Sequence, residues 1–386
     1  MADPFVSPLL LALATAYVAV WALNMVAAGA FSRLGHMIRE AEGGEPEAAG
    51  EGGTPVTLVI THGGSGAELR RLLPAFLEQT YRNAELLLVS TQPLDREADL
   101  YLRLLTPVHP ELHSRILPTH TQGVSAEALT LSLAMRTAEH PWVLVCRLQS
   151  RPAGPGWLGR MMAEIRPGTC FVAGVTLRRP QTFLGLWRLM MILPEACRRG
   201  LYTLPEDNLL VHAPTFLERG GMKRAAGLSR GILAEAVNRL SRPTNTRLCL
   251  LPEAFVWQPS PADAREAMAE ELQRHHAELH FTRRAGHMTR QRAIVGAAWL
   301  HTLLLVAFAL TASVGGHWWM AVPAIPMVAA LFTRRTKQMA VTIAALGLPS
   351  RRLFPGWRLR GLAVARLRML LAYDISDKNE YRKQTN

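Results

Sequence analysis

Residues 55–90 read PVTLVITHGGSGAELRRLLPAFLEQTYRNAELLLVS, and their pattern is the strongest indication of the fold class. Two short runs of mostly aliphatic residues, at 55–61 and 85–90, predict buried strands. Between them lie a glycine-rich turn at residues 63–66 and a segment at 67–80 with apolar residues at helical spacing. A strand, a helix and a second strand in this order predict a parallel pair whose carboxyl ends meet at one edge of a sheet.

The same alternation continues along the chain. Residues 127–138 have helical spacing, residues 142–145 form an apolar strand, and residues 170–177 predict a further strand. This order predicts a doubly wound α/β sheet with a ligand crevice at the carboxyl ends of its strands.

The loop after the strand at 142–145 lies at this predicted crevice. Residues 143–157 read VLVCRLQSRPAGPGW, so a polar turn with Arg147 and Gln149 precedes prolines and glycines, and Trp157 opens a helix. The charged side chain in the polar turn is a cation, and the turn contains no carboxylate.

Three apolar stretches predict membrane helices. Residues 9–31 and 293–314 contain no charged side chain and are about long enough to cross a hydrocarbon core. Residues 318–332 form a shorter apolar run after a turn at 315–317, so the last two stretches predict a helical hairpin. No basic region precedes the first stretch and no cleavage site follows it, which favours an anchor over a removed signal peptide.

Basic residues flank all three stretches and predict the orientation. They are Arg33 and Arg39 after the first stretch, Arg283, Arg284, Arg290 and Arg292 before the second, and Arg334, Arg335 and Lys337 after the third. Because positively charged loops stay inside, the region between the first two stretches is predicted to be cytoplasmic and the amino terminus to be outside.

The formal net charge of +13 comes mostly from the carboxyl-terminal residues 334–386. Within them, residues 353–373 interleave arginines with aliphatic residues, which predicts a basic amphipathic helix bound to anionic lipid of the inner leaflet. A helix docked on the protein's own membrane hairpin is the alternative. Because the charge gathers in this tail, it does not indicate a nucleic-acid-binding protein.

The sequence therefore predicts five parts. They are an anchor at residues 1–32, a linker at 33–54, a cytoplasmic domain at 55–292, a membrane hairpin at 293–333 and a basic cytoplasmic tail at 334–386. The cysteines lack metal-binding spacing and are interpreted as reduced core thiols; they are Cys146, Cys170, Cys197 and Cys249.

The order of these pieces resembles the membrane-bound glycosyltransferases of family 2, which have the GT-A fold. The opening strand–helix–strand unit with Gln79 and Tyr81, the strand segment at residues 243–254 and the helical segment at 263–281 carry the resemblance. It covers residues 55–292 and the membrane layout, and it rests on order and spacing because no motif is intact. The resemblance implies a bacterial inner-membrane protein with a nucleotide sugar as ligand and other envelope-assembly membrane proteins as partners.

The sequence departs from this family at each functional motif. Arg147 and Gln149 stand in the place of the Asp-x-Asp carboxylates that hold a divalent cation, and Thr91 in that of the aspartate that binds the base. Residues 228–231, which include Arg230, replace the acidic catalytic-base segment. Residues 271–275, which keep Arg274, replace the acceptor-site motif.

These departures leave no catalytic residue, metal ligand or cofactor to assign from the resemblance. Arg147, Arg230 and Arg274 are the candidate substrate-binding residues. The remaining candidate acids are Asp207 and Glu235, the latter on a helix predicted at 232–240. Two interpretations of Arg147 stay open: it neutralises a leaving diphosphate in place of a metal, or it pairs with a nearby carboxylate and fills the vacated metal site.

Three functional hypotheses follow from these departures. The first is a catalytically inactive scaffold or regulator of envelope polysaccharide or glycolipid assembly. The second is an active, metal-independent inverting glycosyltransferase that uses a nucleotide sugar. The third is a structural subunit of a membrane assembly whose role is unrelated to sugar transfer.

Overall fold

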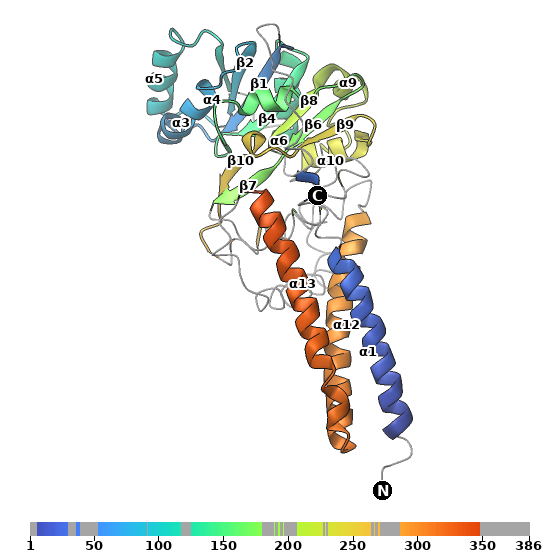
Figure 1. Ribbon diagram of the computed structural model, residues 1–386. Helices are drawn as coiled ribbons and strands as arrows, with labels where there is room; N and C mark the ends of the chain where they lie inside the picture. The colour runs from blue at the N-terminus through green and yellow to red at the C-terminus, as the bar shows by residue number, and fades with distance from the viewer. Residues whose placement is uncertain are drawn as a thin grey trace, which may run out of the picture. The chain divides into compact units, whose positions relative to one another are not determined.

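The computed structural model describes residues 6–29, 36–38, 53–90, 92–116, 125–179, 189, 192–193, 196, 207–226, 228, 231–263, 266, 269–270 and 286–347. Figure 1 shows the ribbon. The chain divides into two compact units, one formed by Met1–Arg39 with Gly286–Asn386 and the other by Glu40–Ala285. The five-part division at the predicted boundaries stays a prediction.

A seven-stranded sheet with the strand order β3-β2-β1-β4-β8-β6-β9 forms the centre of the larger unit. The strands are β1 (Val56–His62), β2 (Ala84–Ser90), β3 (Leu112–Ile116), β4 (Trp142–Arg147), β6 (Phe171–Gly174), β8 (Leu209–His212) and β9 (Thr246–Cys249). β8 runs antiparallel to β4 and β6, and the other neighbouring pairs are parallel. The predicted α/β class and the parallel β1–β2 pair are confirmed, in a mixed and mostly parallel sheet.

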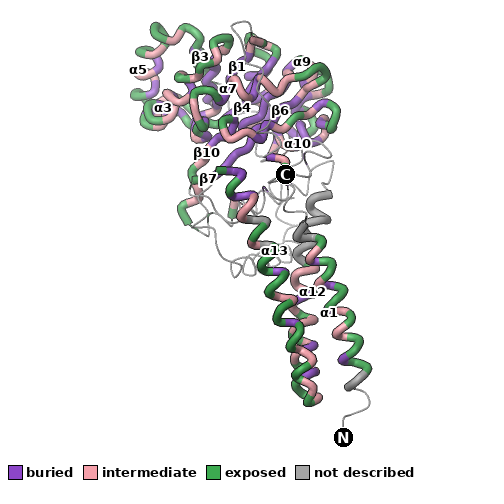
Figure 2. The backbone as a smooth tube through the Cα atoms, in the orientation of Figure 1, coloured by how far each residue is buried: buried purple, intermediate pink, exposed green. Residues whose placement is uncertain are grey.

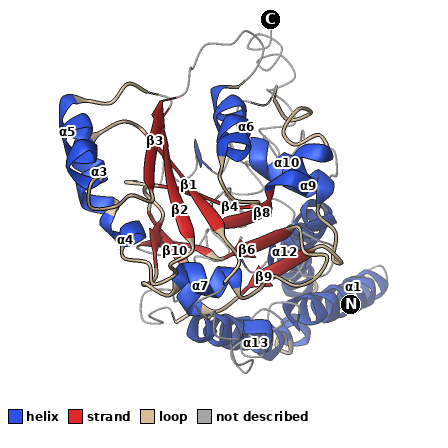
Figure 3. Ribbon diagram, turned by 90° about the horizontal axis from the view of Figure 1, so that it is seen from above, coloured by secondary structure: helices blue, strands red, loops and turns tan. Residues whose placement is uncertain are grey.

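Helices cover both faces of this sheet. They are α3 (Gly66–Leu72), α4 (Pro74–Leu77), α5 (Arg96–Leu105), α6 (Ala126–Thr137), α7 (Trp157–Met162), α9 (Ala213–Glu218) and α10 (Ile232–Leu240). Figure 3 shows α3, α4 and α7 on one side of the sheet and α6, α9 and α10 on the other. The helix predicted over residues 67–80 is divided in two, because Pro74 has no N–H to donate and opens a new helix.

The core of the larger unit lies between the sheet and these helices. β1, β2 and β4 are buried along nearly their whole length, and Figure 2 shows buried residues in purple along the middle of the sheet. Between the sheet and α7, the fully buried ring of Trp157 packs edge-on against Phe76, with 6.0 Å between ring centroids. These strands therefore position the loops at their carboxyl ends rigidly.

A second sheet of three strands has the order β5-β10-β7. Its strands are β5 (Arg151–Pro152), β7 (Thr176–Arg179) and β10 (Val256–Pro259), and a short 3-10 helix, η1 (Pro252–Ala254), precedes β10. The single strand predicted over residues 170–177 is therefore two strands in two sheets, β6 and β7. Gly174 ends β6, and a Cβ atom there would lie 2.1 Å from Nδ2 of Asn208, so only glycine fits at this crossing.

The smaller unit consists of three long helices, α1 (Val6–Gly29), α12 (Gly286–Val314) and α13 (Ala324–Ala345), with a short 3-10 helix, η2 (Trp318–Ala321). Polar groups join them: Trp21 Nε1 donates to Met327 O at 2.8 Å, and Asn24 Nδ2 donates to Ala297 O at 3.0 Å. The ring of Tyr17 stacks on His301 with 5.0 Å between centroids.

Two of these helices, at Pro8–Val26 and Gly296–Val314, are long and apolar enough to cross a membrane, by length and composition. Residues 318–332, which were predicted as a third span, do not form one continuous apolar helix. They are divided between η2 and α13, and α13 continues through Arg334, Arg335 and Lys337. The basic tail segment at 353–373 lies outside the described residues.

The cysteines of the larger unit agree in part with the prediction of core thiols. Cys146 and Cys249 are buried, whereas Cys170 is only half-buried, and Cys197 lies outside the described residues. Burial raises the pKa of the Cys249 thiol to about 12 and that of Cys146 well above its usual range. Both are therefore neutral, unreactive thiols at neutral pH.

Candidate functional site

Arg147 lies where the sequence places it, at the carboxyl end of β4. It pairs in register with Thr61 of β1, and the next residue, Leu148, donates its backbone N–H to Thr61 O at 2.9 Å. The Arg147 side chain is 52% exposed. The loop that follows Arg147 is thus fixed to the neighbouring parallel strand, at the edge where α/β sheets bind ligands.

Asp207 is the partner of Arg147. Its side chain is 1% exposed, its Oδ2 lies 3.0 Å from Nε of Arg147, and its Oδ1 accepts the Arg147 backbone N–H at 2.8 Å. Gln258 of β10 donates its side-chain amide to the same carboxylate and also to Ser150 Oγ, the latter at 2.8 Å. The carboxylate thus has three donors, which is how a buried charge is tolerated.

Asn208 explains how the chain presents Asp207 at this edge. It has a φ of 61°, in the left-handed region that Asn tolerates better than most residues. Its Oδ1 accepts from Nε1 of Trp157 at 3.0 Å, and its Nδ2 donates to Ala254 O at 2.8 Å. Buried hydrogen bonds from α7 and η1 therefore fix the turn that carries the carboxylate.

The loop at residues 152–156 is held by Gln79, one of the residues that carry the family resemblance. Its Oε1 accepts from the Leu158 backbone N–H at 3.1 Å, and its Nε2 donates to Gly154 O at 3.1 Å. Gln79 thereby fixes the backbone of this loop.

The residues at this edge do not fit a divalent cation. Gln149 donates its side-chain amide to Glu68 of α3 at 3.3 Å, a guanidinium stands at the end of β4, and the Asp207 carboxylate is engaged by Arg147 and Gln258. Mg²⁺ and Mn²⁺ require several oxygen ligands without a neighbouring cation. The donor set at the end of β4 is therefore that of an ion pair and not that of a metal site.

Within the described residues, one group of side chains could hold a metal, and it lies elsewhere. Glu85, His113 and Glu139 bring their ligand atoms within 4.8 Å of one another. Glu85 is near the amino end of β2, away from Arg147, and its Oε2 already accepts from Thr57 Oγ1 at 2.6 Å and from Glu139 N at 3.0 Å. This group therefore supplies no ligand to the carboxyl edge where Arg147 lies.

His62 is a buried residue at the same edge that the sequence analysis missed. It ends β1, is 6% exposed, and its Nδ1 accepts from the Gly64 backbone N–H at 3.2 Å. Burial lowers the pKa of His62 to about 4, so the ring is neutral with its proton on Nε2. The signal in the sequence is a polar residue that directly follows the strand predicted at residues 55–61.

The other residues singled out from the sequence lie apart from this site or outside the described residues. Glu235 is buried in the first turn of α10 and takes no part in the Asp207 contacts given above. Arg230, Arg274 and Thr91 lie outside the described residues. Of the candidate side chains, the structure thus brings Arg147, Gln149 and Asp207 to the carboxyl edge of β1 and β4.

No family model and no curated protein sequence matches the chain. Among solved structures, it is similar to the mannosyltransferase PcManGT from Pyrobaculum calidifontis in complex with GDP-Man and Mn²⁺, with 17% identity, a TM-score of 0.52, and coverage of 86% of this chain and 97% of that one. A structure of S. aureus TarS, residues 1–349, matches with 13% identity, a TM-score of 0.41, and coverage of 86% and 92%. The likeness to the mannosyltransferase shows that the chain has a glycosyltransferase fold of the GT-A type.

Proposed function

We propose that this chain is a membrane-embedded protein whose glycosyltransferase fold does not carry out metal-dependent sugar transfer, and that it acts as a scaffold or regulator in the assembly of an envelope polysaccharide or glycolipid. The ion pair between Arg147 and Asp207 carries this proposal. It places a cation where a metal would have to bind and engages the buried carboxylate beside it. The proposal places the protein in a bacterial inner membrane and its larger unit in the cytoplasm.

The membrane arrangement is part of this proposal. The chain crosses three times, through α1, α12 and the apolar residues 318–332, and the tail at 334–386 binds anionic lipid on the cytoplasmic side. The helices α1 and α12, whose length and composition suit a membrane, support the first two crossings. The basic residues after the third stretch support the last.

The exposed fraction of Arg147 favours a second candidate, a metal-independent inverting glycosyltransferase. About half of this side chain is accessible, so a diphosphate could reach the guanidinium while Asp207 holds it in place. An Arg held in this way can stabilise the charge of a leaving phosphate. In this case Arg147, together with Arg230 and Arg274, would bind the nucleotide sugar.

Binding of nucleotide sugars with and without metal tests both candidates against the ordinary enzyme. The full chain in nanodiscs of zwitterionic lipid would be titrated with GDP-mannose and UDP-N-acetylglucosamine, with Mn²⁺ or with EDTA, and donor consumption would be followed in parallel. We expect that Mn²⁺ does not raise the affinity for either nucleotide sugar and that no donor is consumed. Micromolar binding that depends on Mn²⁺ would overturn both candidates.

An Arg147→Ala variant separates the scaffold from the metal-independent enzyme, with Arg151→Ala, four residues further on in β5, as the matched control. If donor is consumed without metal and Arg147→Ala lowers the rate about 10²- to 10³-fold while Arg151→Ala does not, the second candidate is correct. If complementation of the deleted gene in the native host survives Arg147→Ala but fails when residues 55–285 are removed, the scaffold is correct.

A further inference from the structure

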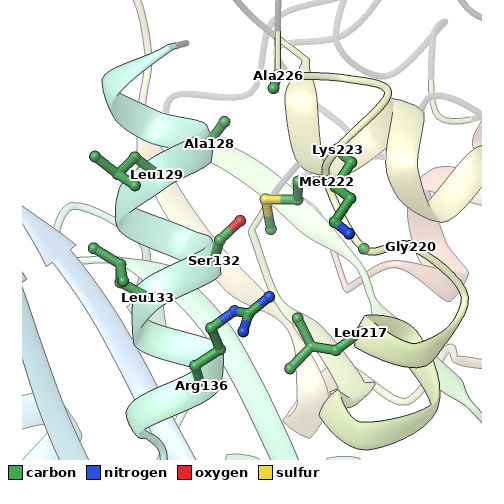
Figure 4. Close-up of a pocket in the computed structure, with 11 residues that line it drawn as sticks. Ala128, Leu129, Ser132, Leu133, Arg136, Leu217, Gly220, Met222, Lys223 and Ala226 are labelled. Atoms are coloured by element: carbon green, nitrogen blue, oxygen red, sulfur yellow. The ribbon is translucent and has the colours of Figure 1, made fainter. Parts of the chain in front are cut away.

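A groove on the larger unit lies between α6 and the segment that follows α9, and none of its lining residues belongs to the Arg147 contacts described above. Its volume is about 380 Å³. Figure 4 shows one wall formed by α6 and the opposite wall by residues between Leu217 and Ala226. This volume is within the range of small-molecule sites, near its lower end.

The floor and walls of the groove are largely apolar. Leu129 and Leu133 come from α6, and Leu217 and Met222 come from the opposite wall. Gly220 and Gly221 add no side chains, and a Cβ atom on Gly220 would meet nothing within 4 Å. The groove therefore offers an apolar surface to a slender ligand.

Three polar side chains face this apolar surface. Ser132 and Arg136 are one helical turn apart on α6, and Figure 4 shows the hydroxyl and the guanidinium projecting towards the wall that carries Lys223. Arg136 and Lys223 are exposed, and neither forms an ion pair within the described part of the chain. Two cations and a hydroxyl thus stand beside an apolar groove whose described lining contains no carboxylate.

The wall opposite α6 is fixed in place before any ligand arrives. Arg239 of α10 donates to Gly221 O at 2.9 Å, and Ser125 donates its backbone N–H to Ala226 O at 2.9 Å. The side chain of Met222 is buried and anchors the middle of the segment. A preformed groove of this kind costs little ordering on binding.

We propose that this groove binds a single-chain amphiphile with an anionic head, whose carboxylate or phosphate contacts Arg136, Lys223 and Ser132 and whose apolar chain lies along Leu129, Leu133 and Leu217. The charge complementarity selects an anion, because a guanidinium, an ammonium and a hydroxyl all donate hydrogen bonds. The apolar walls select a chain over a free anion. This site is independent of the proposed function of the crevice.

Equilibrium dialysis of the full chain in nanodiscs of zwitterionic lipid, with empty nanodiscs subtracted, tests the proposal. The probes are radiolabelled decanoate and decyl phosphate, with decanol as the neutral analogue. We expect saturable binding of one anion per chain, weaker binding of decanol, and weakening of anion binding at high salt, because the cations are exposed. The tighter of the two anions identifies the head group.

Variants locate the site. Arg136→Ala combined with Lys223→Ala should weaken anion binding about tenfold, since each exposed ionic contact contributes about threefold in affinity. Arg224→Ala is the matched control, because Arg224 is exposed, adjacent to Lys223 and not part of the groove. Ser132→Trp should abolish binding by filling the groove, with the melting temperature confirming that the variant folds. Absence of saturable binding, or equal binding by the double variant and the unmodified chain, would overturn the proposal.

Discussion

At the carboxyl end of β4, Arg147 and Asp207 place a cation and an engaged carboxylate side by side. Asp207 is nearly inaccessible and its carboxylate is engaged through both oxygens, while Arg147 is held through its backbone and its side chain. Removing the cation would release an oxygen of Asp207, and carboxylates at 147 and 149 would add oxygen ligands at the same edge of the sheet. The proposal that this edge corresponds to the metal site of the resembled family can therefore be tested by introducing carboxylates there.

The variant with Arg147→Asp and Gln149→Asp is expected to bind Mn²⁺ with a dissociation constant on the order of 10⁻⁴ M, typical of weaker oxygen-ligand sites. Calorimetry of the full chain would measure this, and the unmodified protein should show no Mn²⁺ binding at the crevice. Arg151→Asp, which adds a carboxylate in β5, should not create such a site. A folded double variant that binds no Mn²⁺ at millimolar concentration would contradict the proposal that the carboxyl end of β4 corresponds to a metal site.

His62 is predicted to make the stability of β1 depend on pH. Its pKa is about 4 in the folded chain and about 6.5 when exposed, so on acidification the unfolded chain takes up the proton first. The contribution of neutral His62 to the free energy of unfolding should be fully present above about pH 6.5. It should decrease as the pH falls towards about 4, by at most about 3 kcal/mol in all.

Hydrogen exchange in β1 and β2 peptides at pH values from 7.5 to 4, corrected for intrinsic rates, measures this loss. His62→Asn, which keeps an acceptor for the Gly64 N–H, should remove the pH dependence, whereas the exposed His113→Asn should not. A pH dependence that persists in His62→Asn would assign it to another group.

At the scale of elements, the sequence was informative where burial gives a continuous apolar run. β1 and β2 lie within one residue of the predicted strands, and α10 begins and ends as predicted because its apolar residues repeat at helical spacing. β3 was missed, since four of its five residues are exposed and its pattern is that of a polar segment. Short strands at a sheet edge carry too little pattern to be recognised.

The candidate site was predictable only in part, for a related reason. Arg147 and Gln149 follow a buried strand, so local pattern placed them at the crevice. Gln258 could not be found, because it lies 51 residues from Asp207 and reaches it from the second sheet. Asn208 was missed because its left-handed conformation is specified by tertiary hydrogen bonds to Trp157 and Ala254.

Gly174 is the element junction whose substitution should be most damaging. In Gly174→Ala the new methyl group would overlap Nδ2 of Asn208 and lie 2.9 Å from Ala254 O, so the Asn208 hydrogen bond at 2.8 Å must break. Overpacking and one lost buried hydrogen bond together predict a destabilisation of about 2–4 kcal/mol.

Chemical unfolding followed by tryptophan fluorescence measures the change in the free energy of unfolding. Gly154→Ala is the matched control, because a Cβ atom there meets nothing within 4 Å, and it should change stability by less than about 0.5 kcal/mol. Equal effects of the two substitutions would mean that the contact between β6 and Asn208 does not constrain this junction.

For the molecule as a whole, the smaller unit exposes large apolar side chains along its helices. Leu11, Leu23 and Val26 of α1 are 64%, 63% and 75% exposed, whereas its polar Tyr17 and Asn24 face inward. The inward side also carries the buried Leu10 and Val20. A few polar side chains turned inward, with apolar side chains outward, are the pattern of helices packed within a lipid bilayer. This supports the proposal that α1 and α12 are membrane spans.

The number of spans decides on which side of the membrane the basic tail lies, and α13 is the element in question. It has 22 residues, or about 33 Å of helix, but its apolar part ends where Arg334, Arg335 and Lys337 begin. A crossing therefore has to use η2 and the start of α13. The positive-inside rule then predicts that these cations lie on the cytoplasmic side. We expect a fluorescent-protein fusion after Asn386 and an insertion near Gly44 both to be fluorescent, and alkaline phosphatase at the same points to be inactive.

Replacing Arg334, Arg335 and Lys337 with Ala should weaken this orientation at Asn386 but not at Gly44. If the unmodified chain instead places the two points on opposite sides, α13 does not cross, the chain has two spans, and the tail cannot bind the inner leaflet.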